Sequence, residues 1–357
     1  AFSCLVAWVI SLISSKMRNK NIITMVVSLL FLAAYFYLYS KMGDIISGLI
    51  ANGTAIAVAF KKYAFPAYYF GVGIAEHNLT YLLLYTVCTL VVFELVYAIL
   101  SRSFRQITTA KKGTARIKYK ERSMHVSSPA AALLRKDFRH FIGNPMYVLN
   151  AWMGEILLVV ACVAMLIKKD ILTEFLPILN GEGEIMGLIL CVILCGLSCT
   201  NLITAPSISL EGKNLWIAQS IPVPAGVVLR AKVKLQMLLC IPITALSALL
   251  MGIVLKLELL TLVLAVLVPA AFNLFTALLG VVVNLHFPKF DYINETVVIK
   301  QSMSTMICMF GSMAVVLVLA LLYALLLSAS VAPTLFLAVC LVLLVIVCVL
   351  MWRYLGH

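Results

Sequence analysis

The sequence predicts an all-α, polytopic transmembrane bundle of about nine spans, accompanied by amphipathic interfacial helices. Hydrophobic residues occupy 64% of the 357 positions and charged residues only 11%. The mean hydropathy is +1.10, and a soluble domain of this length could not bury so much apolar surface. Apolar runs of about 20 residues recur along the chain, which is the length that a helix needs to cross a bilayer.

Nine apolar runs define the predicted spans, at residues 1–13, 22–39, 79–100, 146–167, 185–205, 235–255, 258–283, 303–327 and 333–351. The first run is shorter than a span requires, and it begins at Ala1 without a preceding Met. We therefore expect the chain to be a fragment, or to be numbered from a point after a removed segment.

The distribution of basic residues predicts which loops face the cytoplasm. If the spans alternate in direction, the loops on one side hold 21 of the 27 Lys and Arg residues. Cytoplasmic loops are the ones enriched in Lys and Arg, so this side, which includes the C-terminus, is predicted to be cytoplasmic. The formal net charge of +13 is thus explained by membrane topology, and no nucleic-acid partner is needed to account for it.

The order of spans and loops predicts two units. Residues 1–100 are interpreted as the C-terminal half of a first transmembrane unit, with an external segment at 40–78 that holds short interfacial helices. Residues 101–128 are interpreted as a basic cytoplasmic linker, and residues 129–357 as a six-span unit. Tandem halves of this kind are common in membrane transport proteins.

An amphipathic helix, residues 129–144, is predicted to lead into the six-span unit. Ser128 is a suitable N-cap and Pro129 a suitable first helical residue. One face of this helix is apolar and the opposite face is basic, carrying Arg135, Lys136, Arg139 and His140. This pattern is typical of a helix lying at the membrane interface, and a simple juxtamembrane anchor is the alternative interpretation.

The polar segment 206–234 lies between two long apolar runs and is longer than a simple connection requires. It carries one acid, Glu211, four basic residues and the aromatic residue Trp216. The stretch LEGKNLWIAQSI is compatible with a short one-faced helix, which Pro222 and Pro224 then end. Such a helix could bind a soluble partner or lie on the lipid surface, and composition alone favours neither interpretation.

Three segments together resemble the permease subunits of bacterial ABC exporters in the type-2 superfamily, in particular a branch of tandem permeases. These segments read ISLEGKNLWIAQSIPVPAGVVLRAK, LLRKDFRHFIGNP and NLHFPKFDYINETVVIKQS. The resemblance covers most of the chain and is most specific over residues 129–302. The chain departs from the family at its amino end, where the first unit's own coupling loop is missing.

The resemblance implies that helix 129–144 lies along the inner membrane face and that 206–234 contains a coupling helix that docks into a separate ATPase. The implied contact residues are Glu211, Gly212, Lys213, Asn214 and Trp216. The predicted function is then that of a permease subunit that moves an unknown substrate outward through a bacterial cell membrane. Its predicted partners are the ATPase, the lipid bilayer and the transported substrate, with a second permease copy left open.

No catalytic residue is predicted. The chain contains no G-x-x-x-x-G-K-[ST] phosphate loop, and Gly212–Lys213 lacks the spacing of that motif. We therefore expect this chain to hold no cofactor of its own, with ATP and Mg²⁺ bound by the partner ATPase.

A second group of charged residues lies in the loop 284–302. Asp291 and Glu295 are four residues apart, with Lys300 following, so the two acids would share a face if this stretch were helical. They could form a second cytoplasmic contact, or simply a solvated cluster of charges.

Glu94 and Glu155 fall inside predicted spans, where an ionised carboxylate is costly and a functional role is the usual hypothesis. These two acids support an alternative function, an ion-coupled secondary transporter that uses them as its pathway. A protonated Glu hydrogen-bonded across a helix interface would also explain each of them. A membrane scaffold without transport is a third possibility.

The sequence predicts no metal site. Cys191, Cys195 and Cys199 recur every four residues, but no His or further thiolate is placed to complete a soft-metal site. Small residues at this spacing are typical of close helix packing in membranes.

Overall fold

The computed structural model describes residues 20–109, 127–167 and 183–356, and these ranges are helical and contain no β-strand. The chain divides into two compact units, residues 1–123 and residues 124–357. The boundary falls within the predicted basic linker. The assignment of the first unit as half of a larger transmembrane unit stays a prediction.

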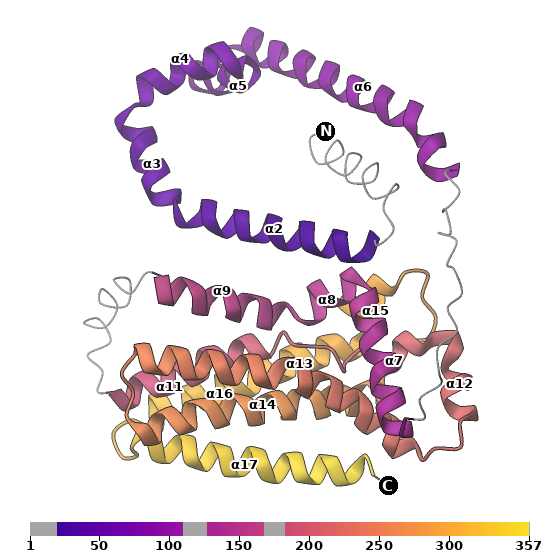
Figure 1. Cartoon of the computed structure of the whole chain (residues 1–357). Coiled ribbons are helices and arrows are strands. Elements are labelled where there is room, and N and C mark those ends of the chain that lie inside the picture. Colours follow the sequence, from indigo (N-terminus) through magenta and orange to yellow (C-terminus); the bar gives the residue numbers. More distant parts are fainter. Residues whose placement is uncertain (1–19, 110–126, 168–182, 357) are drawn as a thin grey trace. The chain divides into compact units, whose positions relative to one another are not determined.

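Unit 1 contains five described helices (Figure 1): α2 (Lys20–Ser40), α3 (Met42–Ala51), α4 (Gly53–Tyr63), α5 (Phe65–Ala75) and α6 (Leu79–Thr109). Three short helices thus occupy the segment 40–78. Helices α5 and α6 pair through aromatic rings, with ring centroids 5.1 Å apart for Tyr69 and Tyr81 and 4.7 Å apart for Phe70 and Tyr85. Helix α6 continues beyond its predicted end at residue 100 into the predicted linker.

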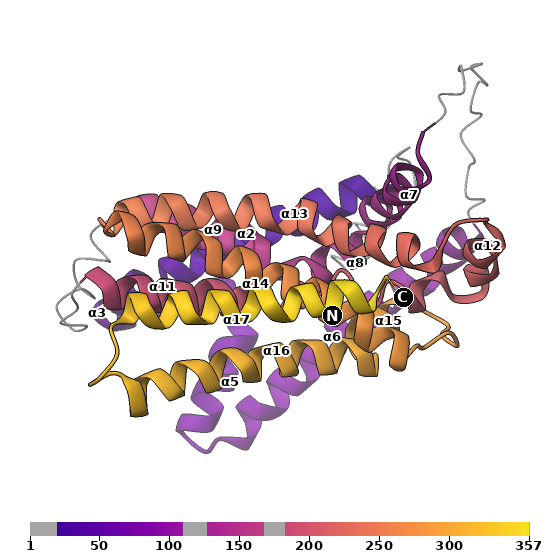
Figure 2. The ribbon, with the colours of Figure 1, turned by 90° about the horizontal axis from the view of Figure 1, so that it is seen from below.

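The described helices of unit 2 are α7 (Pro129–Gly143), α8 (Pro145–Ala151), α9 (Met153–Ile167), α11 (Gly183–Ser198), the 3₁₀ segment η1 (Ser209–Asn214), α12 (Leu215–Ser220), α13 (Ala225–Val254), α14 (Leu259–His286), α15 (Glu295–Gln301), α16 (Met303–Leu322), the π-helical turn η2 (Tyr323–Leu327) and α17 (Pro333–Tyr354). Its long helices lie side by side, with α14 in contact with α11, α13, α16 and α17. Buried side chains such as Leu194, Ala265 and Leu337 form the main core between them. Helices α7, α12 and α15 gather at one end of the unit, near the C-terminus (Figures 1 and 2).

The prediction of about nine spans is not confirmed. Five described helices are long and apolar enough to cross a membrane, or six if α2 and α3, which are bent by 49° at their junction, form one span. The predicted span 1–13 lies outside the described residues. The predicted spans 146–167 and 185–205 are each interrupted, which leaves α9 and α11 as apolar helices too short to qualify.

The two interruptions face each other. Helix α8 ends before Trp152 and α11 ends at Ser198, and Trp152 forms an isolated antiparallel bridge with Asn201. We call residues 199–208 the unwound segment, because no helix covers them. A Cβ atom on Gly154 would lie 2.1 Å from the carbonyl oxygen of Leu197, so the backbones of α9 and α11 are in direct contact at this point. Because both runs are mostly apolar, the sequence did not predict this break.

Candidate functional site

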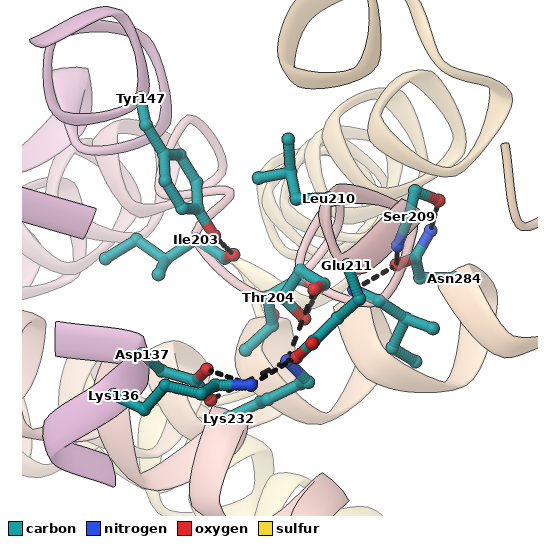
Figure 3. Close-up of polar contacts among 12 residues, drawn as sticks. Lys136, Asp137, Tyr147, Ile203, Thr204, Ser209, Leu210, Glu211, Lys232 and Asn284 are labelled. Carbon is teal, nitrogen blue, oxygen red and sulfur yellow. Dashed lines mark hydrogen bonds and ion pairs between the residues drawn. The ribbon is translucent and has the colours of Figure 1, made fainter. Parts of the chain in front are cut away.

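Four charged side chains from three elements meet at the end of unit 2, and we call them the junction cluster: Lys136, Asp137, Glu211 and Lys232 (Figure 3). The Oε1 atom of Glu211 accepts hydrogen bonds from Nζ of Lys136 and from Nζ of Lys232, each at 2.7 Å. The carboxylate oxygens of Asp137 lie 3.3 Å from Nζ of Lys136 and 3.6 Å from Nζ of Lys232. The balanced cluster therefore links α7, η1 and α13.

Most of this cluster is shielded from solvent. The side chain of Lys232 is 5% exposed and that of Glu211 13%, whereas that of Lys136 is 47% exposed. Burial alone would raise the pKa of the Glu211 carboxyl, but attraction to Lys232 and hydrogen bonds from both lysines hold that pKa below its usual value. For Lys136, burial lowers the pKa of the ammonium group, yet Asp137 and Glu211 together raise it above the usual value. Glu211 and Lys136 therefore stay ionised at neutral pH.

Asn284 of α14 fixes the start of η1. Its Oδ1 atom accepts hydrogen bonds from the backbone N–H groups of Ile208, at 2.8 Å, and Ser209, at 3.1 Å. Its Nδ2 atom donates to Oγ of Ser209 at 2.8 Å (Figure 3). One buried amide thus satisfies backbone groups that the unwound segment leaves without helical partners.

Gly212 allows the chain to change direction inside η1. Its φ angle is +51°, a left-handed conformation that residues with a Cβ rarely adopt. A Cβ at this position would also lie 2.9 Å from the hydroxyl oxygen of Tyr292. That hydroxyl donates to the carbonyl oxygen of Leu210 at 3.1 Å. The turn that follows Glu211 is therefore held from the side of the loop before α15.

Helix α12 presents an apolar face to the exterior. Trp216 is 64% exposed and Ile217 46%, and Ile221, the residue after the helix, is 39% exposed. Cavities lie on two sides of this short helix. One of about 300 Å³ is lined by residues of α7, η1, α12 and α13, and one of about 430 Å³ is lined by residues of η1, α12, α13 and the end of α14. Glu211 and Lys232 line both cavities, so α12 lies next to the junction cluster.

Side chains from neighbouring helices also satisfy the unwound segment. Gln236 of α13 accepts from the backbone N–H of Thr204 at 3.0 Å and donates to the carbonyl oxygen of Asn201 at 3.0 Å. Nζ of Lys232 donates to the carbonyl oxygen of Ser207 at 3.2 Å. Irregular backbone at membrane depth is tolerated only where protein groups satisfy it, and here they do so.

The predicted coupling residues do not share one environment. Glu211 points inward to its two lysines, and Gly212 acts through its backbone. Asn214 and Trp216 are exposed, whereas the side chain of Lys213 lies outside the described residues. Only the exposed members could touch a partner directly, and Glu211 could act only by holding them in place. The coupling role itself stays a prediction.

The expected acid pair of the 284–302 loop does not form on a helix. Helix α15 begins at Glu295, with Asn294 as its N-cap, so Asp291 precedes the helix and the two acids share no helical face. The amide of Asn144 donates to Glu295, which joins α15 to the break between α7 and α8. Lys300 lies exposed in the last turn of α15.

The two predicted pathway acids differ in burial. Glu94 is exposed on α6 of unit 1, whereas Glu155 is 1% exposed at the start of α9 in unit 2. Among the described residues, no group of three or more His, Cys, Asp or Glu side chains is arranged to hold a metal ion.

Several residues of the site were not singled out from the sequence. Asp137 stands in a helix whose other charged residues are basic, and three residues with buried amide side chains stand in the long helices α13 and α14. Gln236, Asn273 and Asn284 are each fully buried. Isolated amides in membrane-spanning segments are costly unless they are hydrogen-bonded, and that was the available signal.

A family model described as "putative ATP-binding cassette" matches residues 44–352. The chain belongs to this family. No curated protein and no solved structure matches the chain.

This ATP-binding cassette family assignment corrects the identification of the chain as an ABC exporter permease subunit. The family match extends across both units, whereas the motifs quoted for the permease resemblance are three short segments. The description of the matched family names an ATP-binding cassette and not a permease. The prediction of a permease that moves a substrate outward is therefore wrong as stated. The ion-coupled alternative is not better supported, because its two acids lie in different units and in opposite environments. The assignment places this helical membrane protein in the general context of ABC transport.

Proposed function

We propose that this chain is a membrane-embedded component of an ATP-binding cassette system, and that a separate ATPase subunit binds it at α12. The observation that carries this proposal is the exposed apolar face of α12. This helix directly follows η1, whose Glu211 is held by ion pairs in the junction cluster. Trp is the residue type most often found at the energetic centre of protein interfaces. At 64% exposure, Trp216 is available for such a contact.

The attachment of α12 suits the transmission of a movement. The residues that lead into α12 are tied to α7 and α13 by ion pairs and to α14 by Asn284. Helix α13 has 30 residues and is therefore about 45 Å long. A displacement of α12 by a bound subunit would thus reach the full length of the bundle through the buried contact between Glu211 and Lys232.

We propose further that the ATPase subunit, and not this chain, holds ATP and Mg²⁺. This sequence has no G-x-x-x-x-G-K-[ST] phosphate loop, the element whose backbone N–H groups cradle nucleotide phosphates. The excess of Lys and Arg in the loops at the α12 end supports a cytoplasmic position for this end and for the C-terminus.

The test is co-purification of the full-length protein in mild detergent. We compare wild type with Trp216→Ala and with Phe310→Ala, a matched control because Phe310 is 54% exposed on the apolar helix α16. An ATPase subunit should accompany wild type and Phe310→Ala but not Trp216→Ala. If no ATPase accompanies wild type, or if both variants retain it equally, the proposed docking surface is wrong. Binding of an ATP analogue by the purified chain alone would refute the proposed division of labour.

A further inference from the structure

The carboxyl group of Glu155 lies in the interior of unit 2, at the point where α9 meets the unwound segment. Its side chain is 1% exposed. The Oε1 atom accepts hydrogen bonds from Nδ2 of Asn201 at 2.9 Å and from Oγ1 of Thr244 at 2.7 Å. The Oε2 atom is buried, and no described residue forms a hydrogen bond with it. The two oxygens of one carboxyl group are therefore in different chemical environments.

Among the residues that the structure describes, no positive charge is paired with Glu155 to balance its ionised form. None of the ion pairs formed by the described residues includes it. The nearest basic residues along α13 are Lys234 and Lys232, ten and twelve residues before Thr244 and so about 15 and 18 Å away along the helix axis. Lys232 is already paired with Glu211.

The other elements packed around Glu155 also lack a balancing group. Helix α14 contributes Asn273, and its one basic residue, His286, lies thirteen residues further on, about 20 Å away. The acid of α11, Glu184, lies at the opposite end of that helix from the break. Cys240 of α13 is the titratable group that interacts with Glu155, and it carries no positive charge. An ionised carboxylate here would be a buried, unpaired charge, which is among the most costly groups in a protein interior.

The surrounding hydrogen bonds distinguish between a proton and a metal cation as the neutralising species. A cation needs several oxygen lone pairs directed at it. Here the amide of Asn201 and the hydroxyl of Thr244 direct hydrogen atoms at the carboxyl group. The amide of Asn273 likewise donates to Oγ1 of Thr244, at 2.9 Å, and to Oγ of Ser198, at 3.1 Å. These donors leave no set of lone pairs for a cation, but they also favour the ionised carboxylate. The case for a proton therefore rests on the burial of Glu155 and on the lack of a counter-charge among the described residues.

We propose that Glu155 is a proton-binding site in the core of unit 2, and that its neutral carboxylic acid joins α9 to the unwound segment. The proton resides on Oε2, since Oε1 already accepts two hydrogen bonds. The backbone N–H of Glu155 donates to Oδ1 of Asn201 at 3.1 Å, so the same residue is bound to the unwound segment twice. The folded protein thereby keeps one proton that an unfolded, solvated Glu releases at neutral pH. This proposal is independent of the ATPase partner.

Infrared difference spectroscopy of the full-length protein tests the proposal directly. At neutral pH the wild type should show the C=O stretch of a protonated carboxyl group. Glu155→Gln should lose this band, whereas Glu184→Gln, a control in a second apolar helix, should keep it. Glu155→Asp should shift it, which supplies a readout if the Gln variant does not fold. Absence of the band from wild type, or its survival in a folded Glu155→Gln, overturns the proposal.

Thermal unfolding separates the proton from a cation. If the folded state binds a proton, the midpoint of wild type should fall relative to that of Glu155→Gln as the pH rises from acidic to neutral. Replacing sodium by N-methylglucamine at constant ionic strength should leave the wild-type midpoint unchanged. A sodium-dependent increase in the midpoint that disappears in Glu155→Gln would instead identify a cation site and refute the proton assignment.

Discussion

The substitution Gly154→Ala tests the backbone contact between α9 and the end of α11. The added Cβ would lie 2.1 Å from the carbonyl oxygen of Leu197, 2.6 Å from Oδ1 of Asn201 and 2.7 Å from Oγ1 of Thr200. Two of these three atoms belong to a backbone carbonyl and to an amide that bonds Glu155, so neither can move freely. Overpacking of this kind costs about 1–3 kcal/mol. A displaced Asn201 would add about 1–3 kcal/mol for buried hydrogen bonds left unmade.

The gain in helix propensity opposes this cost but is smaller, about 1 kcal/mol for Gly to Ala in a helix interior and less near a helix start. We therefore expect Gly154→Ala to destabilise unit 2 by about 1–5 kcal/mol. The control is Gly196→Ala in α11, where a Cβ would meet nothing within 4 Å. The assay is thermal unfolding in detergent, followed by tryptophan fluorescence. Equal midpoints for Gly154→Ala and Gly196→Ala would refute the close approach of the two segments.

Three further predictions concern the junction cluster and the start of η1. Glu211→Ala should cost about 3 kcal/mol because it leaves the buried Lys232 with Asp137, at a longer distance, as its one acidic contact in the cluster. Glu211→Ala combined with Lys232→Met should recover most of that loss in chemical unfolding. Because the pKa of Glu211 is lowered in the folded protein, its ionised form stabilises the fold above pH 4.5, the ordinary carboxyl value, and this stabilisation is lost as the pH falls below 4.5. Because the pKa of Lys136 is raised, its charged form stabilises the fold up to pH 10.5, and this stabilisation is lost only at higher pH. The stability difference between wild type and the double variant should therefore be constant between these limits, and a change near neutral pH would contradict the ionised cluster. Asn284→Ala should cost about 2–4 kcal/mol and expose the unwound segment to hydrogen exchange, because it leaves two buried backbone N–H groups without an acceptor, whereas unchanged exchange would show that η1 is held by other contacts.

The sequence was sufficient to predict the helical membrane class and several helix starts, because composition and capping act locally. Ser128 caps α7 by accepting a hydrogen bond from the backbone N–H of Ala131, as a Ser before Pro would suggest. The break at Trp152 and Asn201 was not predictable in this way. Both residues stand in apolar runs, and the interactions that favour unwinding come from helices far along the chain.

The site shows the same division between local and distant causes. The exposure of Trp216 follows from its place in a short polar segment, whereas the inward direction of Glu211 depends on Lys136 and Lys232, which lie 75 and 21 residues away. A lone acid among bases reads as a surface group until its partners are known. Sequence patterns predict which residues are unusual, and only the packing decides which of them are paired.

The unwound segment also bears on how the protein is assembled in its membrane. Its backbone is satisfied by Gln236, Asn284 and Lys232, all of which lie later in the chain. During synthesis this stretch therefore leaves the ribosome before its hydrogen-bonding partners have been made. It must remain helical or hydrated until α13 and α14 insert beside it, since bare peptide groups are not tolerated in lipid. Biogenesis of this bundle consequently includes a late step in which the unwound segment takes its final backbone conformation against helices that are made after it.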